Sequence, residues 1–122
     1  MSAPRVTVRR VYSREPVSGK AVLVDRVWPR GVSRSELEGV EWLPAVGPSG
    51  DLRKWFGHRP ERWEEFRRRY RAELMEGEGA AAFERLEALA REGPLTLLFG
   101  ARDEERNQAV VVRELLLERL RT

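Results

Sequence analysis

The 122-residue sequence contains no cysteine and a single histidine, and both shortages limit its chemistry. Without cysteine there are no disulfides, zinc–thiolate sites or thiol nucleophiles, so cysteine-dependent phosphatase and rhodanese-type chemistry is excluded. His58 alone cannot build a zinc site from the usual ligand sets. We predict no metal site, although carboxylates alone can hold Mg²⁺, and the sequence identifies no cofactor.

Lysine is also scarce: only Lys20 and Lys54 of the 23 basic residues are lysines, which leaves 21 arginines. The net charge is +3 and the isoelectric point is about 9.9. Arginine suits anion and nucleic-acid binding, because its guanidinium matches the oxygens of phosphate and carboxylate groups. Glutamates are interspersed among the arginines, however, so a GC-rich or thermophilic composition is the preferred explanation.

No apolar run approaches the roughly 18 residues that a membrane-spanning helix needs, and the N-terminal stretch lacks the apolar region of a signal peptide. We therefore expect a cytoplasmic protein with no membrane partner. The length predicts a single domain over residues 1–122. The sequence also contains no P-loop, dinucleotide fingerprint, nucleophile elbow or kinase signature.

Two apolar runs predict buried strands, one beginning within residues 21–28 and the other at 94–100. Residues 5–12 alternate as a half-buried strand does, but the connection 13–20 is too short for a comfortable parallel crossover, so the direction of this strand stays open. Alternation of strands with helices predicts an α/β fold. We expect a small parallel or mixed sheet with helices packed on it, in one three-layer-like domain.

Several start and stop signals predict the helices. Residues 33–36 form a capping box, Asp51 can cap a short helix, and Pro60 fits the first position of a long one. We expect Gly77 and Gly79 to end that long helix. Residues 40–50, broken by proline and glycine, are predicted to be a loop with one helical turn.

Two polar segments follow the buried strands, at the edge where ligands bind in open α/β sheets. They are 25–31 (DRVWPRG) and 100–107 (GARDEERN). Arg26, Arg30 and Arg102 are predicted to converge there on an anion, since guanidinium groups match phosphate and carboxylate oxygens. Glycine in each segment, at Gly31 and Gly100, would let the backbone approach a ligand closely.

Acidic residues in the same segments are candidates for catalysis. Asp25 or Asp103 would serve as a base or metal ligand, with His58 assisting. Two structural explanations compete with this hypothesis. Asp25 can form an ion pair with Arg26 or Arg30 that closes the strand end, and His58 can be a surface residue before a helix. Asp103 can equally cap the last helix.

Aromatic and arginine-rich stretches give weaker signals. Trp28 and Trp55 lie off any clear helical stripe, so each is a candidate ligand-stacking residue. Residues 67–71 (RRRYR) are typical of a solvated helix face, and the alternative is a patch that follows nucleic-acid phosphates.

Long, irregular motifs occur in order along nearly the whole chain: VLVDRVWPRG (22–31), PSGDLRKWFGH (48–58), PERWEEF (60–66) and GPLTLLFGARDEERNQAVV (93–111). Together they resemble the YeaO-like branch of the DUF488 family. The resemblance implies an α/β fold but little about function, because members are chiefly described as domains of unknown function. Its signature segments imply a site formed by Asp25, Arg26, Trp28, Pro29, Arg30 and Gly31 with Trp55, His58, Asp103 and Asn107. One departure is Arg106, where many relatives carry histidine.

Three functions are therefore open. The first is an anion-binding domain, which could include an enzyme acting on a phosphorylated or nucleotide-like small molecule. The second is a nucleic-acid-binding accessory protein that uses residues 67–71. The third is a non-catalytic homodimeric interaction protein, whose interface would be the apolar final helix with Val112, Leu116 and Leu120 on one face.

Overall fold

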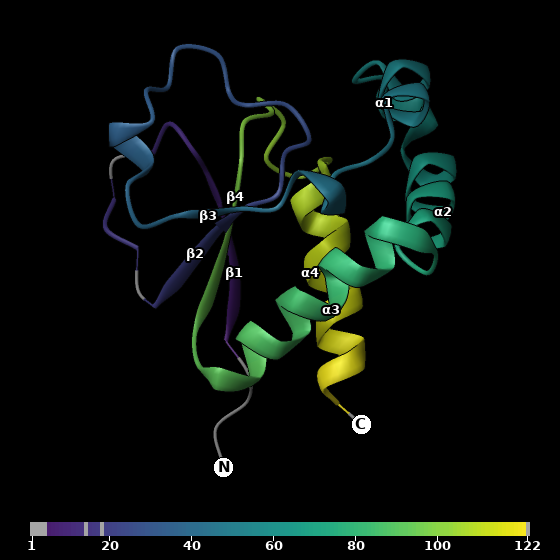
Figure 1. Ribbon diagram of the computed structural model, residues 1–122. Helices are drawn as coiled ribbons and strands as arrows, with labels where there is room; N and C mark the ends of the chain where they lie inside the picture. Colours follow the sequence, from purple (N-terminus) through teal and green to yellow (C-terminus); the bar gives the residue numbers. More distant parts are fainter. Residues whose placement is uncertain (1–4, 14, 18, 122) are drawn as a thin grey trace.

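The computed structural model describes residues 5–13, 15–17 and 19–121. Within them the strands are β1 Val6–Arg10, β2 Lys20–Leu23, β3 Glu41–Trp42 and β4 Leu95–Phe99. The α-helices are α1 Gly50–Phe56, α2 Trp63–Glu73, α3 Gly77–Glu92 and α4 Gln108–Leu120 (Figure 1). The described part of the connections contains three 3₁₀ turns: η1 Ser35–Leu37, η2 Pro44–Val46 and η3 Pro60–Arg62.

The strands form one parallel sheet in the order β1-β4-β2-β3. β4 takes an inner position and all of its residues are buried, as its continuous apolar run predicts. β1 runs parallel to β4 and places Thr7 opposite Thr96, with their hydroxyl oxygens 3.0 Å apart. The direction of the first strand is therefore settled as parallel. The two-residue β3 lies in the segment predicted to be a loop, and the predicted helical turn there is η2.

The connection from β1 to β2 explains why the direction of the first strand was hard to predict. Only nine residues lie between Arg10 and Lys20, yet β2 starts on the far side of β4. A parallel crossover usually takes a dozen or more residues and contains a helix. A fully extended chain of nine residues reaches ~30 Å, which is longer than the path back along a five-residue strand and past one neighbour.

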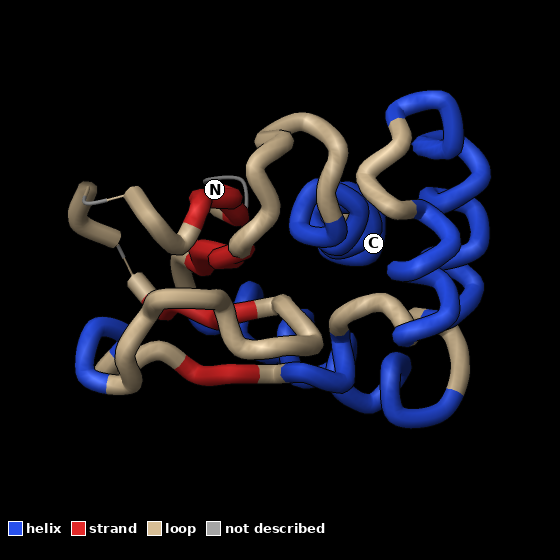
Figure 2. Tube along the Cα trace, turned by 90° about the horizontal axis from the view of Figure 1, so that it is seen from above, coloured by secondary structure: helices blue, strands red, loops and turns tan. Residues whose placement is uncertain are grey.

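Helices and a loop cover opposite faces of the sheet. The larger cluster of buried residues joins β1, β2 and β4 to all four α-helices, and α4 packs directly on β1 and β4. On the other face, the segment 28–42 packs on Ala21, Leu23 and Leu98. Figure 2 shows α1, α2 and α4 on one side of the strands and mostly loop on the other. The α/β prediction is confirmed, with a fully parallel sheet whose second face is covered by a loop and η1.

Two predicted helix caps were wrong. Ser49, and not Asp51, caps α1: its hydroxyl oxygen accepts a hydrogen bond from the Leu52 N–H at 3.1 Å. Asn107, and not Asp103, caps α4 by accepting from the Val110 N–H at 3.2 Å. In each case the helix begins one residue after the capping side chain. Asp51 lies inside the first turn of α1, and Asp103 lies four residues before the cap of α4, so neither is placed to accept from the free N–H groups.

The glycines expected to end the long helix instead open the next one. α2 ends at Glu73, and Gly77 is the first residue of α3, with a φ of +55° that side chains rarely adopt. Gly79 lies so close to α2 that a Cβ would approach the Glu73 carbonyl oxygen to 2.8 Å. The short turn between α2 and α3 therefore depends on glycine. Pro60 also starts a 3₁₀ turn, η3, that leads into α2.

The Asn107 cap gives the first testable prediction. Asn107 is 2% exposed, its oxygen caps α4, and its amide donates to the Asp103 carbonyl at 2.9 Å. We expect Asn107→Ala to lower the free energy of unfolding by about 1 kcal/mol or more, because a buried cap and a loop contact are both lost. Urea denaturation measures the loss. Asn107→Ser keeps a capping oxygen and should lose clearly less; equal losses would show that the cap contributes little.

Candidate functional site

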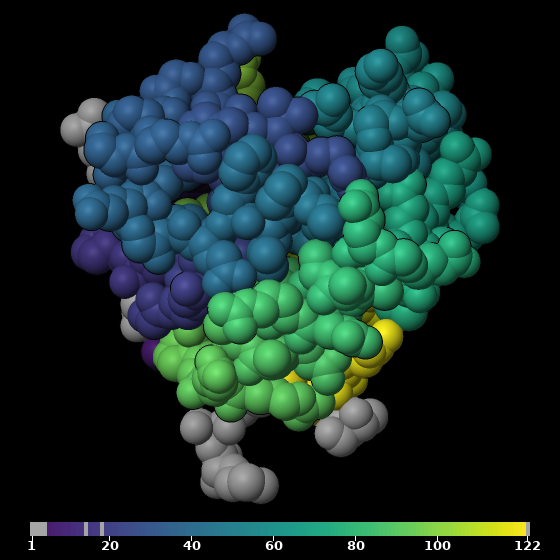
Figure 3. All heavy atoms as spheres, in the orientation of Figure 1, coloured from purple at the N-terminus to yellow at the C-terminus, as the bar shows by residue number. Residues whose placement is uncertain are grey.

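A cavity of about 730 Å³ opens at the carboxyl edge of the sheet, beyond β2 and β4. Most predicted site residues line it: Asp25, Arg26, Trp28, Arg30, His58, Arg102, Asp103 and Asn107. Gly31 and Trp55 are not among the lining residues. In Figure 3 the surface is hollowed at the top, between the segment that follows β2 and α1. The two polar segments therefore meet as expected, and Arg30 and Asp103 face the same space.

Asp25 is the half-buried carboxylate of this cavity. Its Oδ2 accepts a hydrogen bond from the Gly100 N–H at 2.9 Å, and its Oδ1 accepts one from the Gln108 side-chain amide. The Trp42 indole N–H donates to the Asp25 backbone carbonyl at 2.8 Å and holds the segment in place. Burial raises the pKa of Asp25 to about 6, although both hydrogen bonds and the charge of Arg53 act to lower it.

Gly100 is required by the position of that carboxylate. A Cβ on residue 100 would lie 2.8 Å from the Asp25 Oδ2 atom, closer than carbon and oxygen normally approach. The sequence suggested that Gly100 leaves room for a ligand, and the structure shows that it leaves room for Asp25. Gly31 has a φ of +77° and no atom near its missing side chain, so it serves the turn after Pro29.

The ion pair that would have explained Asp25 structurally is not formed. Among the described residues, Asp25 has no salt bridge to Arg26 or to Arg30. Arg26 instead donates to two backbone carbonyls, from Nε to Pro48 at 2.8 Å and from Nη2 to Gly47 at 3.0 Å. Arg26 therefore has a structural role, because it anchors the loop before α1 to the end of β2, and its role as an anion ligand stays a prediction.

Among the described residues, five arginines and two aspartates line the cavity, so this part of its wall carries excess positive charge. Arg106 is paired with Asp103 at 3.2 Å. Arg30 and Arg102 are exposed, and in the part of the chain that the structure describes their guanidinium groups have no hydrogen bond or ion pair. The Tyr12 hydroxyl donates to the Arg30 backbone carbonyl at 2.7 Å and fixes the loop that carries Arg30. These two cations are available to a ligand.

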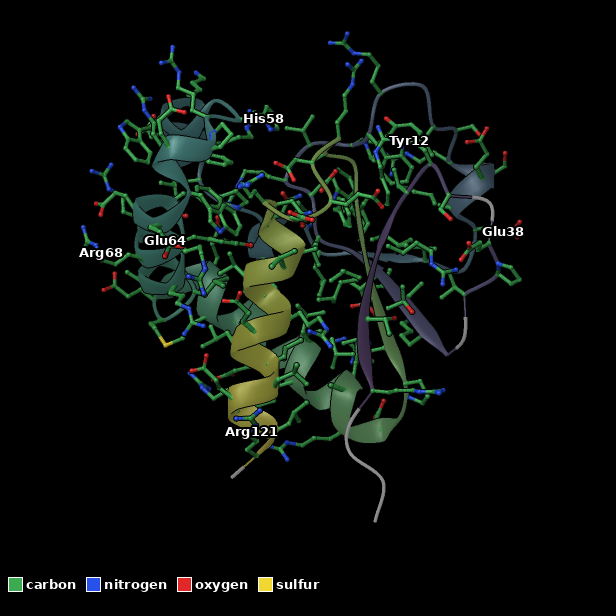
Figure 4. All side chains as sticks on the ribbon, turned by 180° about the vertical axis from the view of Figure 1, so that it is seen from behind. Tyr12, Glu38, His58, Glu64, Arg68 and Arg121 are labelled. Atoms are coloured by element: carbon green, nitrogen blue, oxygen red, sulfur yellow. The ribbon has the colours of Figure 1, made fainter. Side chains whose placement is uncertain are left out.

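His58 lines the cavity on the side across from Tyr12. It is exposed, as expected for a surface histidine before a helix. Its φ of +56° follows Gly57 at +52°, so two successive residues are left-handed after α1. A non-glycine residue in this region is uncommon and typical of constrained sites. Figure 4 shows His58 and Tyr12 on opposite sides of the loop that follows β4. The left-handed turn after α1 thus places His58 in the cavity wall across from Tyr12.

The two candidate stacking tryptophans are engaged within the protein. The Trp28 indole N–H donates to the Val32 carbonyl at 2.6 Å, and the Arg34 guanidinium lies 4.1 Å from the Trp28 ring. Trp55 is covered by the cations of Arg62 at 5.0 Å and Arg69 at 4.4 Å. Trp28 contributes one wall of the cavity, while Trp55 belongs to the α1–α2 surface.

Several lining residues were missed by sequence reasoning. Arg53 and Phe56 face the cavity from α1, and a helical spacing of three residues is a signal that could have paired them. Phe66 is buried in the core and also reaches the cavity, stacked on Phe56 at 4.4 Å between ring centroids. No sequence pattern pointed to Gln108, because only the packing of α4 near the end of β2 brings it to Asp25.

The arginines of α2 are paired with glutamates. Arg67 and Arg71 contact Glu114 of α4 at 2.6 Å and 3.3 Å. Arg68 and Arg69 both contact Glu65 on the same helix, at 2.5 Å and 2.7 Å. These pairs neutralise much of the patch that residues 67–71 suggested and use its charges to join α2 to α4.

Residues 5–13, 15–17 and 19–121 contain neither a membrane-spanning helix nor a cluster of metal-binding side chains. No helix in these ranges combines the length and apolarity needed to cross a bilayer. No group of three histidine, aspartate or glutamate side chains there is placed to hold a metal ion. The arginine-lined cavity is the feature from which a function can be argued.

Comparison with known proteins gives a family and no activity. A family model described as "Inactive DUF488-N3 subclade" (DUF488-N3i) matches residues 5–122. The uncharacterized protein Rv3073c of Mycobacterium tuberculosis is 39% identical over 113 residues, which cover 92% of this chain and 93% of that protein. The uncharacterized protein YeaO of Escherichia coli is 38% identical over 112 residues, covering 91% and 96%. No solved structure matches the chain.

Proposed function

We propose that this chain, which belongs to the DUF488-N3i family, binds a small anionic ligand, phosphorylated or nucleotide-like, in the cavity beyond β2 and β4. The observation that carries the proposal is the pair of exposed guanidinium groups, Arg30 and Arg102, which lack a partner among the described residues and face one cavity. Guanidinium groups bind phosphate and carboxylate oxygens through charge-assisted hydrogen bonds.

Binding without turnover is the form of this function that we favour. The family description calls the subclade inactive. Arg106 stands where the resemblance places a histidine, and an arginine side chain stays charged and cannot exchange protons at neutral pH as a histidine does. It is paired with Asp103. The proposal therefore keeps Asp25, His58 and Asp103 as ligand-facing residues and assigns them no catalytic step. A cytoplasmic location stays part of the proposal.

The cavity is a better candidate binding site than the two alternative surfaces, residues 67–71 and the last helix. Nucleic-acid binding was based on residues 67–71, whose arginines are paired with Glu65, Glu114 and Glu118. The homodimer was based on the apolar side of the last helix, and Val112 and Leu116 of that helix are fully buried in the core of the monomer. Neither surface offers unused groups comparable with Arg30 and Arg102.

A thermal-shift titration tests the anion site. Inorganic phosphate, nucleotides and phosphosugars are each titrated, and a rise in the melting temperature reports binding, since binding to the native state stabilises it by mass action. We expect Arg30→Ala and Arg102→Ala to weaken binding ~10- to 100-fold each, the loss expected for one charge-assisted hydrogen bond.

The matched control is Arg91→Ala, which removes an exposed arginine of α3 that lies outside the cavity and pairs with Glu87. It should bind like the wild type. Equal shifts in the wild type, Arg30→Ala and Arg102→Ala would place the anion elsewhere, and no shift with any ligand would contradict the proposed function.

A further inference from the structure

Asp25 keeps hydrogen-bonding capacity that the protein itself does not use. A carboxylate offers about four acceptor positions, two on each oxygen. Within the described residues, Oδ2 accepts from the Gly100 N–H and Oδ1 accepts from the Gln108 amide. One acceptor position therefore remains on each oxygen. The two donors come from different parts of the fold, the residue after β4 and the start of α4. Together they fix the plane of the carboxylate, and with it the directions of the two remaining acceptor positions.

The cavity wall changes character from its inner part to its opening. Trp28, Pro29 and Phe56 contribute apolar groups to the lining of the cavity that also contains the half-buried Asp25. The exposed Arg30 and Arg102 supply positive charge at the opening. A ligand that uses all of these features must combine two neighbouring hydrogen-bond donors, an apolar body and an anionic group. A volume of about 730 Å³ is within the range of small-molecule sites.

We infer that the cavity takes a guanine nucleotide, with the donor edge of the base on Asp25 and the phosphate at Arg30 and Arg102. This inference rests on the proposed anion-binding function and goes further by naming the base. Guanine presents its N1–H and N2–H₂ groups side by side, and two parallel donors match the two oxygens of a carboxylate, as an arginine fork does. Adenine and cytosine place an acceptor beside their amino group, and uracil has one ring N–H between two carbonyls, so each matches only one oxygen.

Calorimetric titration with four phosphate monoesters at pH 8 tests the inference. The probes are GMP, IMP, AMP and ribose 5-phosphate, which share the 5′-phosphate. The three nucleotides differ in the edge of the base, and ribose 5-phosphate has no base. We expect GMP to bind at least ~10-fold more tightly than IMP, which lacks only the N2 amino group, because one charged acceptor would then lose its partner. AMP and ribose 5-phosphate should bind no more tightly than IMP.

Two variants assign the discrimination to its residues. Asp25→Asn should erase the preference for GMP over IMP, since an amide offers one acceptor and one donor in place of two acceptors. Arg30→Ala should weaken all four ligands by a similar factor and leave the preference intact, and Arg91→Ala should change neither.

The possible results separate this inference from the proposed function. Equal affinity for GMP and IMP, with all four ligands weakened by Arg30→Ala, would overturn the guanine assignment and leave the anion site standing. No heat and no thermal shift with any of the four, or with inorganic phosphate, would overturn both. If circular dichroism shows that Asp25→Asn does not fold, the GMP-to-IMP ratio of the wild-type protein decides alone.

Discussion

Asp25→Asn is expected to be more stable than the wild type at pH 8, and this advantage is expected to disappear near pH 4. Burial raises the pKa of Asp25 from 3.8 to about 6 in the native protein. The native state therefore holds a proton that the unfolded chain releases at lower pH, and the wild type loses stability as the pH rises from about 4 to about 6. The difference between the two pKa values corresponds to about 3 kcal/mol at most.

Asparagine fits the position without this dependence on pH. It carries no charge, and its oxygen can keep the hydrogen bond from the Gly100 N–H. The Gln108 amide can turn over and accept from the new amide group, so both contacts survive. Urea unfolding of both proteins between pH 4 and pH 8 measures the effect. A difference in unfolding free energy that stays constant across this range would contradict the burial of a charged Asp25.

Asp103→Asn is the matched control, and its expected change has the opposite sign. Hydrogen bonds from the Glu105 and Arg106 N–H groups, both at 3.0 Å, lower the pKa of Asp103, and the nearby Arg106 cation adds to this. A lowered pKa contributes stability above pH 3.8 that is lost as the pH falls. Asp103→Asn should therefore be less stable than the wild type at pH 8, and the gap should close in acid.

These opposite expectations for two aspartates of one cavity show what the sequence can predict. The apolar runs that become β2 and β4 indicate where each strand ends, and parallel pairing brings the segments after them to one edge. The location of the site therefore follows from strand patterns alone. The state of each carboxylate does not, because it depends on Gly100 and Gln108 for Asp25 and on a local turn for Asp103.

Long-range contacts account for most of the remaining differences. Arg26 looks like an anion ligand in the sequence, but its guanidinium reaches backbone carbonyls 21 and 22 residues away. Residues 67–71 look like a basic patch until α4 brings Glu114 and Glu118 beside them. Local start signals predicted α1 and the turn that leads into α2, whereas the caps at Ser49 and Asn107 were missed because neighbouring aspartates carry the same propensity.

Gly47→Ala is the second substitution with a large expected effect. A Cβ at residue 47 would lie 2.6 Å from the Arg26 backbone nitrogen and 3.1 Å from its Cα, and backbone atoms cannot move aside as a flexible side chain does. The Arg26 guanidinium holds the same loop through the Gly47 and Pro48 carbonyls, so separating the two segments also weakens these hydrogen bonds. We expect the free energy of unfolding to fall by about 1–3 kcal/mol, as for other overpacked sites.

Gly50→Ala provides the comparison, because it changes the same residue type three positions away with the opposite expectation. Gly50 begins α1, its φ is not in the left-handed region, and no atom lies within 4 Å of the position that a Cβ would take there. Alanine should therefore leave stability unchanged or raise it by up to about 1 kcal/mol. Thermal unfolding separates the two variants.

Because Arg26 joins the end of β2 to the loop before α1, the displacement caused by Gly47→Ala should also move the cavity walls apart and weaken ligand binding. Normal binding by Gly47→Ala would contradict this expectation and show that the cavity tolerates the shift.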